Sequence, residues 1–472
     1  MSLRPIALVV VAVPLAMFAP VRRQAPAHAP VSQTALDRYV AAPDSNFSWK
    51  VLRDLPADGV QATLLEMTSQ KWLTEREVER PLWTHWITVA RPAQIKNDVA
   101  LLFITGGRLD REPPKAPSPW LAEVARETGT VAAELRLVPN EPVVFKDDPE
   151  HQPRIEDDFI AYTWDKFLRT GDERWPARLP MTKSAVRAMD TVTAFMASPQ
   201  GGGAKVSRFV VSGASKRGWT TWTTAAVDHR VVAIAPAVID LLNVEPSFVH
   251  HWQAYGRWSN AVDDYVRYGI MDWMGSREFH ALMRIEEPYE YRDRLTMPKL
   301  LVNASGDEFF LPDSSRFYFD DLEGENHLRY VANTGHSLEK TDAVETIEAF
   351  YSDIAANTPR PAITWTFEKD GSIRVVAKDR PRAVRVWQAI DSRARDFRLV
   401  TIGPAYHSTP LTPSGPNTWV AHVEQPPAGW TAFYVEMDFP SAGVHPLKVT
   451  TAVRVLPDTL PYPPPKASRG TK

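Results

Sequence analysis

Cysteine is absent from all 472 residues of the chain. This absence excludes disulfide bonds, a thiol nucleophile and lipid attachment through an N-terminal cysteine. It does not exclude an oxidising compartment, because a chain of this length buries a core large enough to be stable without disulfides.

A strong charge of either sign is missing as well. The formal net charge is −3 and the basic residues are scattered, so the charge pattern does not indicate binding to nucleic acid. We expect no nucleic-acid partner. Aromatic residues are plentiful by contrast. Of the 16 tryptophans, we expect most to fill the core and some to line a substrate cleft.

The apolar run near the N-terminus, residues 6–18, is too short to span a bilayer comfortably. Arg4 precedes the run, and small residues suited to cleavage follow it. We therefore predict that residues 1–29 form a signal peptide and that the protein is periplasmic or secreted. Arg22 and Arg23 are atypical of a signal peptide, which leaves open an uncleaved N-terminal membrane anchor.

Apolar runs and amphipathic helical patterns alternate through most of the chain. Continuous apolar runs are typical of strands buried on both faces of a parallel sheet. The alternation predicts right-handed βαβ units in a three-layer α/β sandwich with a mostly parallel central sheet. The expected strands include residues 98–105, 130–135, 209–211, 231–236, 299–304 and 327–332, and the expected helices include residues 120–126, 181–196 and 342–355.

Two long stretches interrupt this alternation. Residues 138–178 are rich in proline and acidic residues, and we expect this excursion to border the ligand cleft. Residues 240–290 are rich in aromatic residues and histidine, and we predict a helical insertion over the active site.

The composition changes near residues 358–361, where proline alternates with other residues. Short alternating runs follow and predict an antiparallel β-sandwich-like domain over residues 359–460, after a first domain over residues 30–358. The proline-rich residues 461–472 are predicted to be disordered. The expected strands of the second domain are residues 362–368, 372–377, 384–388, 419–423, 432–437 and 448–455.

One short stretch, residues 209–219, resembles a nucleophile elbow. An apolar run ends at Gly213, Ser215 follows, and a helical pattern of small residues comes next. Such a strand-to-helix turn presents a serine hydroxyl above a parallel sheet. The usual pattern is G-x-S-x-G, but here Arg217 takes the place of the second glycine and Gly218 comes one residue later.

Two further residues complete a candidate catalytic triad with Ser215. Asp307 and His336 each follow a predicted strand, in the chain order Ser, Asp, His that is typical of an α/β-hydrolase. A histidine activates the serine by taking its proton, and a carboxylate orients the histidine. Asp240 and Glu308 are the alternative acids.

Each member of this triad also has an ordinary structural interpretation. Ser215 fits a small turn residue, Asp307 a helix cap and His336 a surface histidine. Their common position after predicted strands, in the expected order, favours the catalytic interpretation.

The neighbours of Ser215 supply candidates for the other parts of the site. The backbone N–H of Lys216 is the first candidate for the oxyanion hole, and Gly106 or Gly107 the second. Arg217, Trp164 and Trp219 are candidate substrate-binding residues. For the charged pair Lys216 and Arg217, ion pairs with carboxylates in residues 145–165 are an equally good alternative.

We predict no metal and no cofactor. His250 and His251 are adjacent in the sequence, but neighbouring residues of a helix point in different directions and no carboxylate partner is obvious.

Six motifs of the chain resemble the PhoPQ-activated pathogenicity-related protein family. They are MTSQKW (67–72), AYTWDKF (161–167), LPMTKS (179–184), GASKRGW (213–219), IDLLN (239–243) and NTGHS (333–337). The resemblance implies an α/β-hydrolase fold and an exported or envelope location in bacteria. The family also includes secreted proteins of social amoebae that repress cell proliferation. The spacing of Ser215 and Gly218 is similar to that in glucuronoyl esterases.

Together these features predict an exported serine hydrolase that cleaves an ester or amide bond through an acyl-enzyme. The substrate would be a small molecule or a peptide. Two alternatives stay open, a peptidase of the α/β-hydrolase type and a non-catalytic binding or signalling protein on the same scaffold. The sequence does not indicate the oligomeric state.

Overall fold

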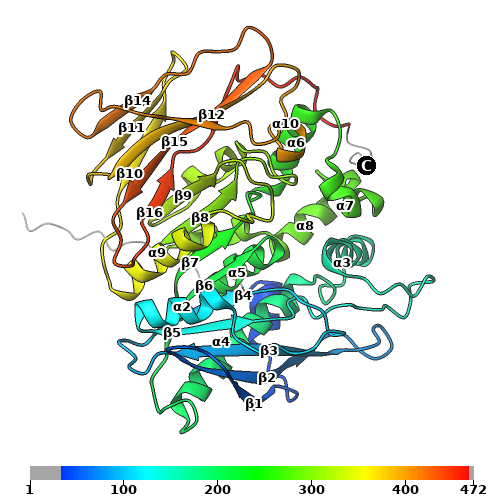
Figure 1. Ribbon diagram of the computed structural model, residues 1–472. Coiled ribbons are helices and arrows are strands. Elements are labelled where there is room, and N and C mark those ends of the chain that lie inside the picture. The colour runs from blue at the N-terminus through cyan, green and yellow to red at the C-terminus, as the bar shows by residue number, and fades with distance from the viewer. Residues whose placement is uncertain (1–32, 467–472) are drawn as a thin grey trace, which may run out of the picture. The chain divides into compact units, whose positions relative to one another are not determined.

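A mixed sheet built around parallel strands organises the chain (Figure 1). The computed structural model describes residues 33–466, so the predicted signal peptide and residues 467–472 lie outside the described residues. Strands β5, β4, β6, β7, β8 and β9 run parallel to one another, while β1, β2 and β3 form an antiparallel edge that joins β5. These strands are β1 (Ser48–Leu55), β2 (Gln61–Lys71), β3 (Leu82–Arg91), β4 (Val99–Ile104), β5 (Val131–Leu135), β6 (Arg208–Ala214), β7 (Val231–Ala237), β8 (Lys299–Ala304) and β9 (Asn326–Val331).

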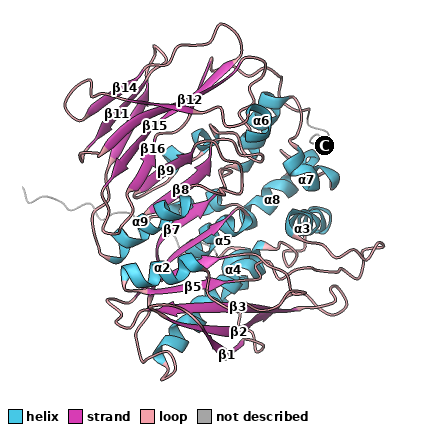
Figure 2. Cartoon of the chain, in the orientation of Figure 1, coloured by secondary structure: helices cyan, strands magenta, loops and turns pink. Residues whose placement is uncertain are grey.

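Helices cover both faces of this sheet (Figure 2). Successive strand residues point to opposite faces of the sheet. Leu101 and Val210 therefore belong to the core under one helix layer, and Leu102 and Val211 belong to the core under the other layer. This arrangement confirms the predicted three-layer α/β-hydrolase sandwich. One layer contains α2 (Pro119–Thr128) and α9 (Ala343–Ala355), and the other contains α1 (Ala35–Ala41), α4 (Arg178–Ala197) and α5 (Lys216–Val227).

The predicted helical insertion lies between β7 and β8. No helix within residues 33–466 is long and apolar enough to cross a membrane. The insertion contains α6 (Val244–Tyr255), η1 (Asn260–Val262), α7 (Asp263–Arg267), η2 (Ile270–Trp273), α8 (Arg277–Glu286) and η3 (Pro288–Arg294).

The excursion at residues 138–178 contains a helix that the sequence interpretation missed, α3 (Glu156–Thr170). Its first turn holds Glu156, Asp157 and Asp158, and negative charge there is favourable at the N-terminal end of a helix dipole. The abundance of acidic residues concealed the helical spacing of Phe159, Tyr162 and Phe167 behind them.

Antiparallel strands follow α9, as predicted, and they continue the central sheet. Strand β16 pairs with β9 at Thr450 and Leu328, and the order then runs through β15 and β12 to β13. Strands β10, β11 and β14 form a separate sheet that packs on this extension through Val375 and Trp419. The bounds are β10 (Ile363–Phe367), β11 (Ile373–Ala377), β12 (Ala383–Asp391), β13 (His407–Pro410), β14 (Thr418–Ala421), β15 (Trp430–Phe439), β16 (Leu447–Thr450) and β17 (Arg454–Leu456), with the short helix α10 (Leu399–Ile402) between β12 and β13.

The single strand expected at residues 448–455 is in fact two strands. Both β16 and β17 pair with β15, at different parts of its length, and the chain between them leaves the ladder. Residues 461–466 of the predicted disordered tail are described, and the N–H of Tyr462 donates to the carbonyl of Gln253 in α6. The predicted domain boundaries at 29/30 and 358/359 stay predictions.

A buried ion pair reinforces the join between the parallel sheet and its antiparallel extension. Arg329 on β9 contacts Glu436 on β15, and both side chains are about 3% exposed. Arg329 also lies 2.8 Å from Asp342, which in turn lies 2.5 Å from the ammonium group of Lys448 on β16. The pairing between β9 and β16 is short. The ion pairs of these side chains therefore help to hold the parallel sheet and its antiparallel extension together.

We expect Arg329→Met to lower the free energy of unfolding by about 3 kcal/mol, because Glu436 stays buried after losing one of its partners. The matched control is Arg374→Met on β11, which removes an exposed ion pair with Glu368 and should cost far less, because water and salt screen such a pair. Urea unfolding followed by circular dichroism measures both. Equal losses in the two variants would show that the join does not depend on this pair.

Candidate active site

Ser215 lies at the turn between β6 and α5 with the backbone of a nucleophile elbow. Its φ of 57° and ψ of −127° are strained for a residue with a side chain. Two backbone hydrogen bonds hold this conformation: the N–H of Ser215 donates to the carbonyl of Ala237 on β7, and its carbonyl accepts from the N–H of Trp219. The strand–turn–helix context that the motif requires is therefore present.

The displaced glycine of the motif has a steric explanation. A Cβ atom on Gly218 would lie 2.9 Å from the carbonyl oxygen of Ala237 and 3.0 Å from that of Gly213. A Cβ on Gly213 would lie 2.8 Å from the carbonyl oxygen of Arg217. The helix thus approaches strands β6 and β7 so closely at position 218 that a side chain there would meet both carbonyls.

His336 and Asp307 form the pair that the sequence predicts. The Nδ1 atom of His336 lies 2.9 Å and 3.1 Å from the two carboxylate oxygens of Asp307. Asp307 is buried, and its carboxylate also accepts hydrogen bonds from the N–H groups of Phe309 and Phe310. Both residues lie in loops after parallel strands, β8 for Asp307 and β9 for His336.

This pairing changes the protonation of the histidine. Burial by itself lowers the pKa of His336, but the negative charge of Asp307 and the hydrogen bond to it together outweigh burial, and the pKa is raised above 6.5. The Nε2 atom is buried and has no hydrogen-bond partner among the described residues. It is therefore free to bond a serine hydroxyl or a substrate atom.

The two alternative acids have other partners. Glu308 accepts the backbone N–H of His336 at 2.8 Å, so its carboxylate fixes the loop rather than the imidazole ring. Asp240 accepts hydrogen bonds from the hydroxyls of Tyr318 and Tyr330. Burial raises the pKa of Asp240 to about 7. Sequence reasoning had not assigned Glu308 this positioning contact, because it depends on how the loops after β8 and β9 meet.

Ser215 opens onto a small cavity of about 30 Å³. Trp164 and Trp219, two of the predicted substrate-binding residues, line it. Phe309 and Phe310 line it too, and the ring of His336 contacts theirs at centroid distances of 4.3 Å and 5.9 Å. These two phenylalanines connect the histidine to the cavity of the serine.

Residues that the sequence interpretation did not single out complete the cavity wall. Buried Arg178 lies over the ring of Trp219 at 5.0 Å, and its guanidinium lies 3.5 Å from Glu286. The insertion contributes Phe248, Val262 and Tyr265. The wall is therefore mostly apolar and aromatic.

The charged pair beside Ser215 is occupied by carboxylates of α3. The Lys216 ammonium lies 2.7 Å from Glu156 and 3.2 Å from Asp157. Arg217 holds Glu156 through both terminal nitrogens and donates from Nε to the carbonyl of Val138. These two cations outweigh burial and hold the pKa of Glu156 well below its usual range. The pairing is the alternative that the sequence left open for Lys216 and Arg217.

The candidate oxyanion donors lie on neighbouring elements. Lys216 is the first residue of α5, and Gly106 and Gly107 follow β4, which pairs with β6. The N–H groups of Gly106 and Gly107 have no acceptor within residues 33–466. A Cβ on Gly106 would lie 2.3 Å from the Arg217 guanidinium, so a side chain at this position would require Arg217 to move.

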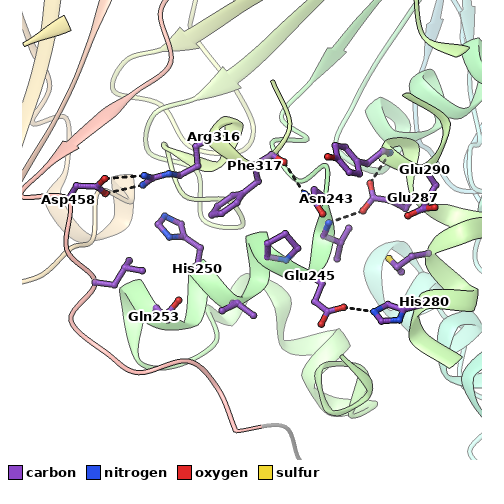
Figure 3. Close-up of a pocket in the computed structure, with 16 residues that line it drawn as sticks. Asn243, Glu245, His250, Gln253, His280, Glu287, Glu290, Arg316, Phe317 and Asp458 are labelled. Atoms are coloured by element: carbon purple, nitrogen blue, oxygen red, sulfur yellow. Dashed lines mark hydrogen bonds and ion pairs between the residues drawn. The ribbon is translucent and has the colours of Figure 1, made fainter. Parts of the chain in front are cut away.

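A larger cavity of about 890 Å³ lies along α6 and contains none of the triad residues (Figure 3). Arg316 and Asp458 form an ion pair at one side of it, and Glu245 contacts His280 at the other. Its size alone does not make it a catalytic site, because neither a nucleophile–base pair nor a strained serine lines it.

The adjacent histidines of α6 are engaged in protein contacts. His250 lies 3.1 Å from Asp313, which also contacts Arg395, and the Nε2 of His251 accepts the N–H of Ser259. The two rings face different partners, so the described residues place no shared ligand site at this pair.

The chain was compared with known proteins. The model of the PhoPQ-activated pathogenicity-related protein family matches residues 36–398. Autocrine proliferation repressor protein A of Dictyostelium discoideum is 36% identical over 463 residues, which are 92% of each chain.

Solved structures resemble the chain more distantly. An acetyl xylan esterase from Paenibacillus sp. R4 is 13% identical, with a TM-score of 0.47 over 68% of this chain and 92% of that chain. A glucuronoyl esterase from Solibacter usitatus is 12% identical, with a TM-score of 0.40 over 69% of this chain and 91% of that chain. Likenesses this distant say nothing about the substrate. The family match and the 36% identity show that the chain belongs to the PhoPQ-activated pathogenicity-related protein family.

Proposed function

We propose that this protein is an exported serine hydrolase that cleaves an ester or amide bond through an acyl-enzyme. The observation that carries the proposal is the strained backbone of Ser215 at a strand-to-helix turn, together with a histidine whose Nδ1 is held by Asp307 and whose Nε2 has no hydrogen-bond partner among the described residues, Ser215 included. Export is supported by the family match and by the N-terminal sequence pattern.

In the proposed reaction, the Oγ atom of Ser215 attacks the carbonyl carbon of the substrate while His336 Nε2 accepts the hydroxyl proton. Asp307 stabilises the imidazolium that forms. The same proton then passes from His336 to the leaving group, and the acyl group stays on Ser215. Water, activated by His336, hydrolyses the acyl-enzyme in the second half of the reaction.

Backbone N–H groups would stabilise the negative oxygen of the tetrahedral intermediate. The N–H of Lys216 lies directly after the nucleophile, at the start of α5, where the helix dipole favours negative charge. The unpaired N–H of Gly106 or Gly107 supplies the second donor. Lys216 thus acts through its backbone while its side chain holds α3.

The aromatic wall limits the acyl group. A water molecule needs about 10–15 Å³ of such space, so a cavity of about 30 Å³ accepts a group no larger than an acetyl. Trp164 and Trp219 would contact this group. Arg217 remains a predicted substrate-binding residue, and it would have to exchange Glu156 for an anionic part of the substrate.

A second candidate function follows from the relative in Dictyostelium, whose name describes the repression of proliferation. A chain 36% identical to it can share a signalling role that needs no catalysis. Ser215→Ala separates the two functions, because a non-catalytic signal would survive the substitution in a proliferation assay.

The nucleophile is tested with a fluorophosphonate probe and with a panel of acyl esters and aminoacyl amides. We expect the wild type to be labelled and active, and Ser215→Ala to lose labelling and at least about 10³-fold in kcat, because the remaining site cannot form the acyl-enzyme. The matched control is Ser337→Ala, which alters an exposed serine next to His336 and should behave as wild type. Equal labelling of wild type and Ser215→Ala would refute the assignment.

The acyl pocket is tested by chain length. We expect kcat/KM to be highest for acetyl esters and to fall at least about 10-fold for butyryl esters, because the longer chain does not fit the cavity. Leu241→Ala should widen the cavity and reduce this ratio, whereas Leu55→Ala, at a similarly buried leucine on β1, should leave it unchanged. A wild-type preference for octanoyl esters or for peptides would contradict the proposed pocket, the latter favouring a peptidase.

A further inference from the structure

A second group of titratable side chains lies on the opposite helix layer from α5. Helices α2 and α9 pack against each other and present carboxylates at the contact. Glu123 and Glu127 are one turn apart on α2, and Glu345 and Glu348 are three residues apart on α9. Among the described residues, none of these four carboxylates forms an ion pair. Like charges on facing helices repel each other unless a cation or a proton neutralises them.

A histidine from the antiparallel part of the chain joins this group. His445 lies in the loop between β15 and β16. The loop is held on α9, where the N–H of Ala442 donates to Asp353 at 2.6 Å. One ligand atom each from Glu127, Glu348 and His445 lies within 4.8 Å of the other two. Three segments distant in sequence thus place metal-ligating atoms together.

Two of these ligand groups lack the partners that buried polar atoms require. Glu348 is only 5% exposed, and its Oε1 atom has no hydrogen-bond partner among the described residues. The Oε2 atom of Glu127 is likewise buried without a partner. Leaving such oxygens unpaired is costly, so the cluster calls for a positive ligand.

We propose that Glu127, Glu348 and His445 bind a divalent cation of the zinc type. An imidazole together with two carboxylates is a ligand set that zinc accepts, whereas calcium prefers oxygen ligands alone. Ligands about 2.1 Å from one tetrahedral ion lie about 3.4 Å from one another. The three ligand atoms lie within 4.8 Å of one another, so binding the ion would draw them closer together.

The position of the site defines what the cation does. It joins α2 and α9, which cover the parallel sheet, to the β15–β16 loop of the antiparallel extension. Glu127 lies before the N-terminal end of β5, whereas Ser215 follows the C-terminal end of β6. The two residues therefore lie at opposite ends of the parallel strands. The cation is thus a structural clamp that takes no part in acyl transfer.

The ammonium group of Lys96 is a competing counter-charge for Glu127. Lys96 lines a cavity of about 220 Å³ together with Glu127 and Ser352. Its ammonium forms no ion pair among the described residues, and a rotation of its side chain would be the alternative way to neutralise Glu127. The experiment therefore includes Lys96→Met.

The test uses the full, untagged chain after treatment with a chelator, with Zn²⁺ and Ca²⁺ added separately. We expect one Zn²⁺ to bind per chain in calorimetry, and Tm to rise by at least about 3 °C at 100 times the Kd. Glu348→Gln and His445→Ala should each weaken Zn²⁺ binding at least 10-fold and reduce the Tm shift. The matched control, Glu123→Gln, should bind Zn²⁺ as the wild type does. Fluorophosphonate labelling, or circular dichroism if no labelling occurs, checks that each variant is folded.

Three outcomes would overturn the proposal. The first is the absence of a Tm shift with Zn²⁺ in the wild type, and the second is unchanged Zn²⁺ binding in His445→Ala, which would place the ion elsewhere. The third is a response to Ca²⁺ without one to Zn²⁺. If Lys96→Met destabilises the chain and Zn²⁺ has no effect, Lys96 is the counter-charge instead.

Discussion

The close crossing of α5 over strands β6 and β7 is the constraint on which the site depends. The helix approaches so closely at Gly218 that any side chain there would meet the carbonyl of Ala237. Ser215, just before this helix, has a positive φ of 57° and lines the aromatic cavity. The glycine that the close approach requires stands at position 218, and an arginine paired with Glu156 occupies the place of the usual glycine.

The two cations next to Ser215 also help to shape the site. Lys216 and Arg217 hold Glu156 and Asp157, so they fasten α3 over the elbow. That helix brings Trp164 to the cavity wall, and the insertion after β7 adds the rest of the cover. The cavity at Ser215 is thus small because two excursions from the sheet cover the elbow. In the proposed reaction, an acyl group larger than an acetyl would have to move one of them.

Much of the fold, and the positions of the candidate triad residues after strands, could be predicted from the sequence, because buried strands and the elbow leave local signatures. The apolar runs before Ser215, Asp307 and His336 were sufficient to place these residues after strands. Local signals did not reveal α3, whose acidic first turn resembles a loop, or the contact of Glu308 with the His336 backbone. The cluster of Glu127, Glu348 and His445 was also invisible, because about 220 residues separate Glu127 from Glu348 and about 100 separate Glu348 from His445. Only the packing of α2 on α9 and of the β15–β16 loop on α9 unites them.

The most direct test of the account is the pH dependence of kcat/KM on an acetyl ester. His336 must be neutral to accept the serine proton, and Asp307 raises its pKa, so activity should rise with pH along a limb above pH 6.5. In Asp307→Asn the limb should move to lower pH and kcat should fall by about 10⁴-fold. Asp240→Asn, which alters the acid bonded to two tyrosines, should leave the limb in place. An unchanged limb in Asp307→Asn, or a shifted one in Asp240→Asn, would contradict the assignment of the triad.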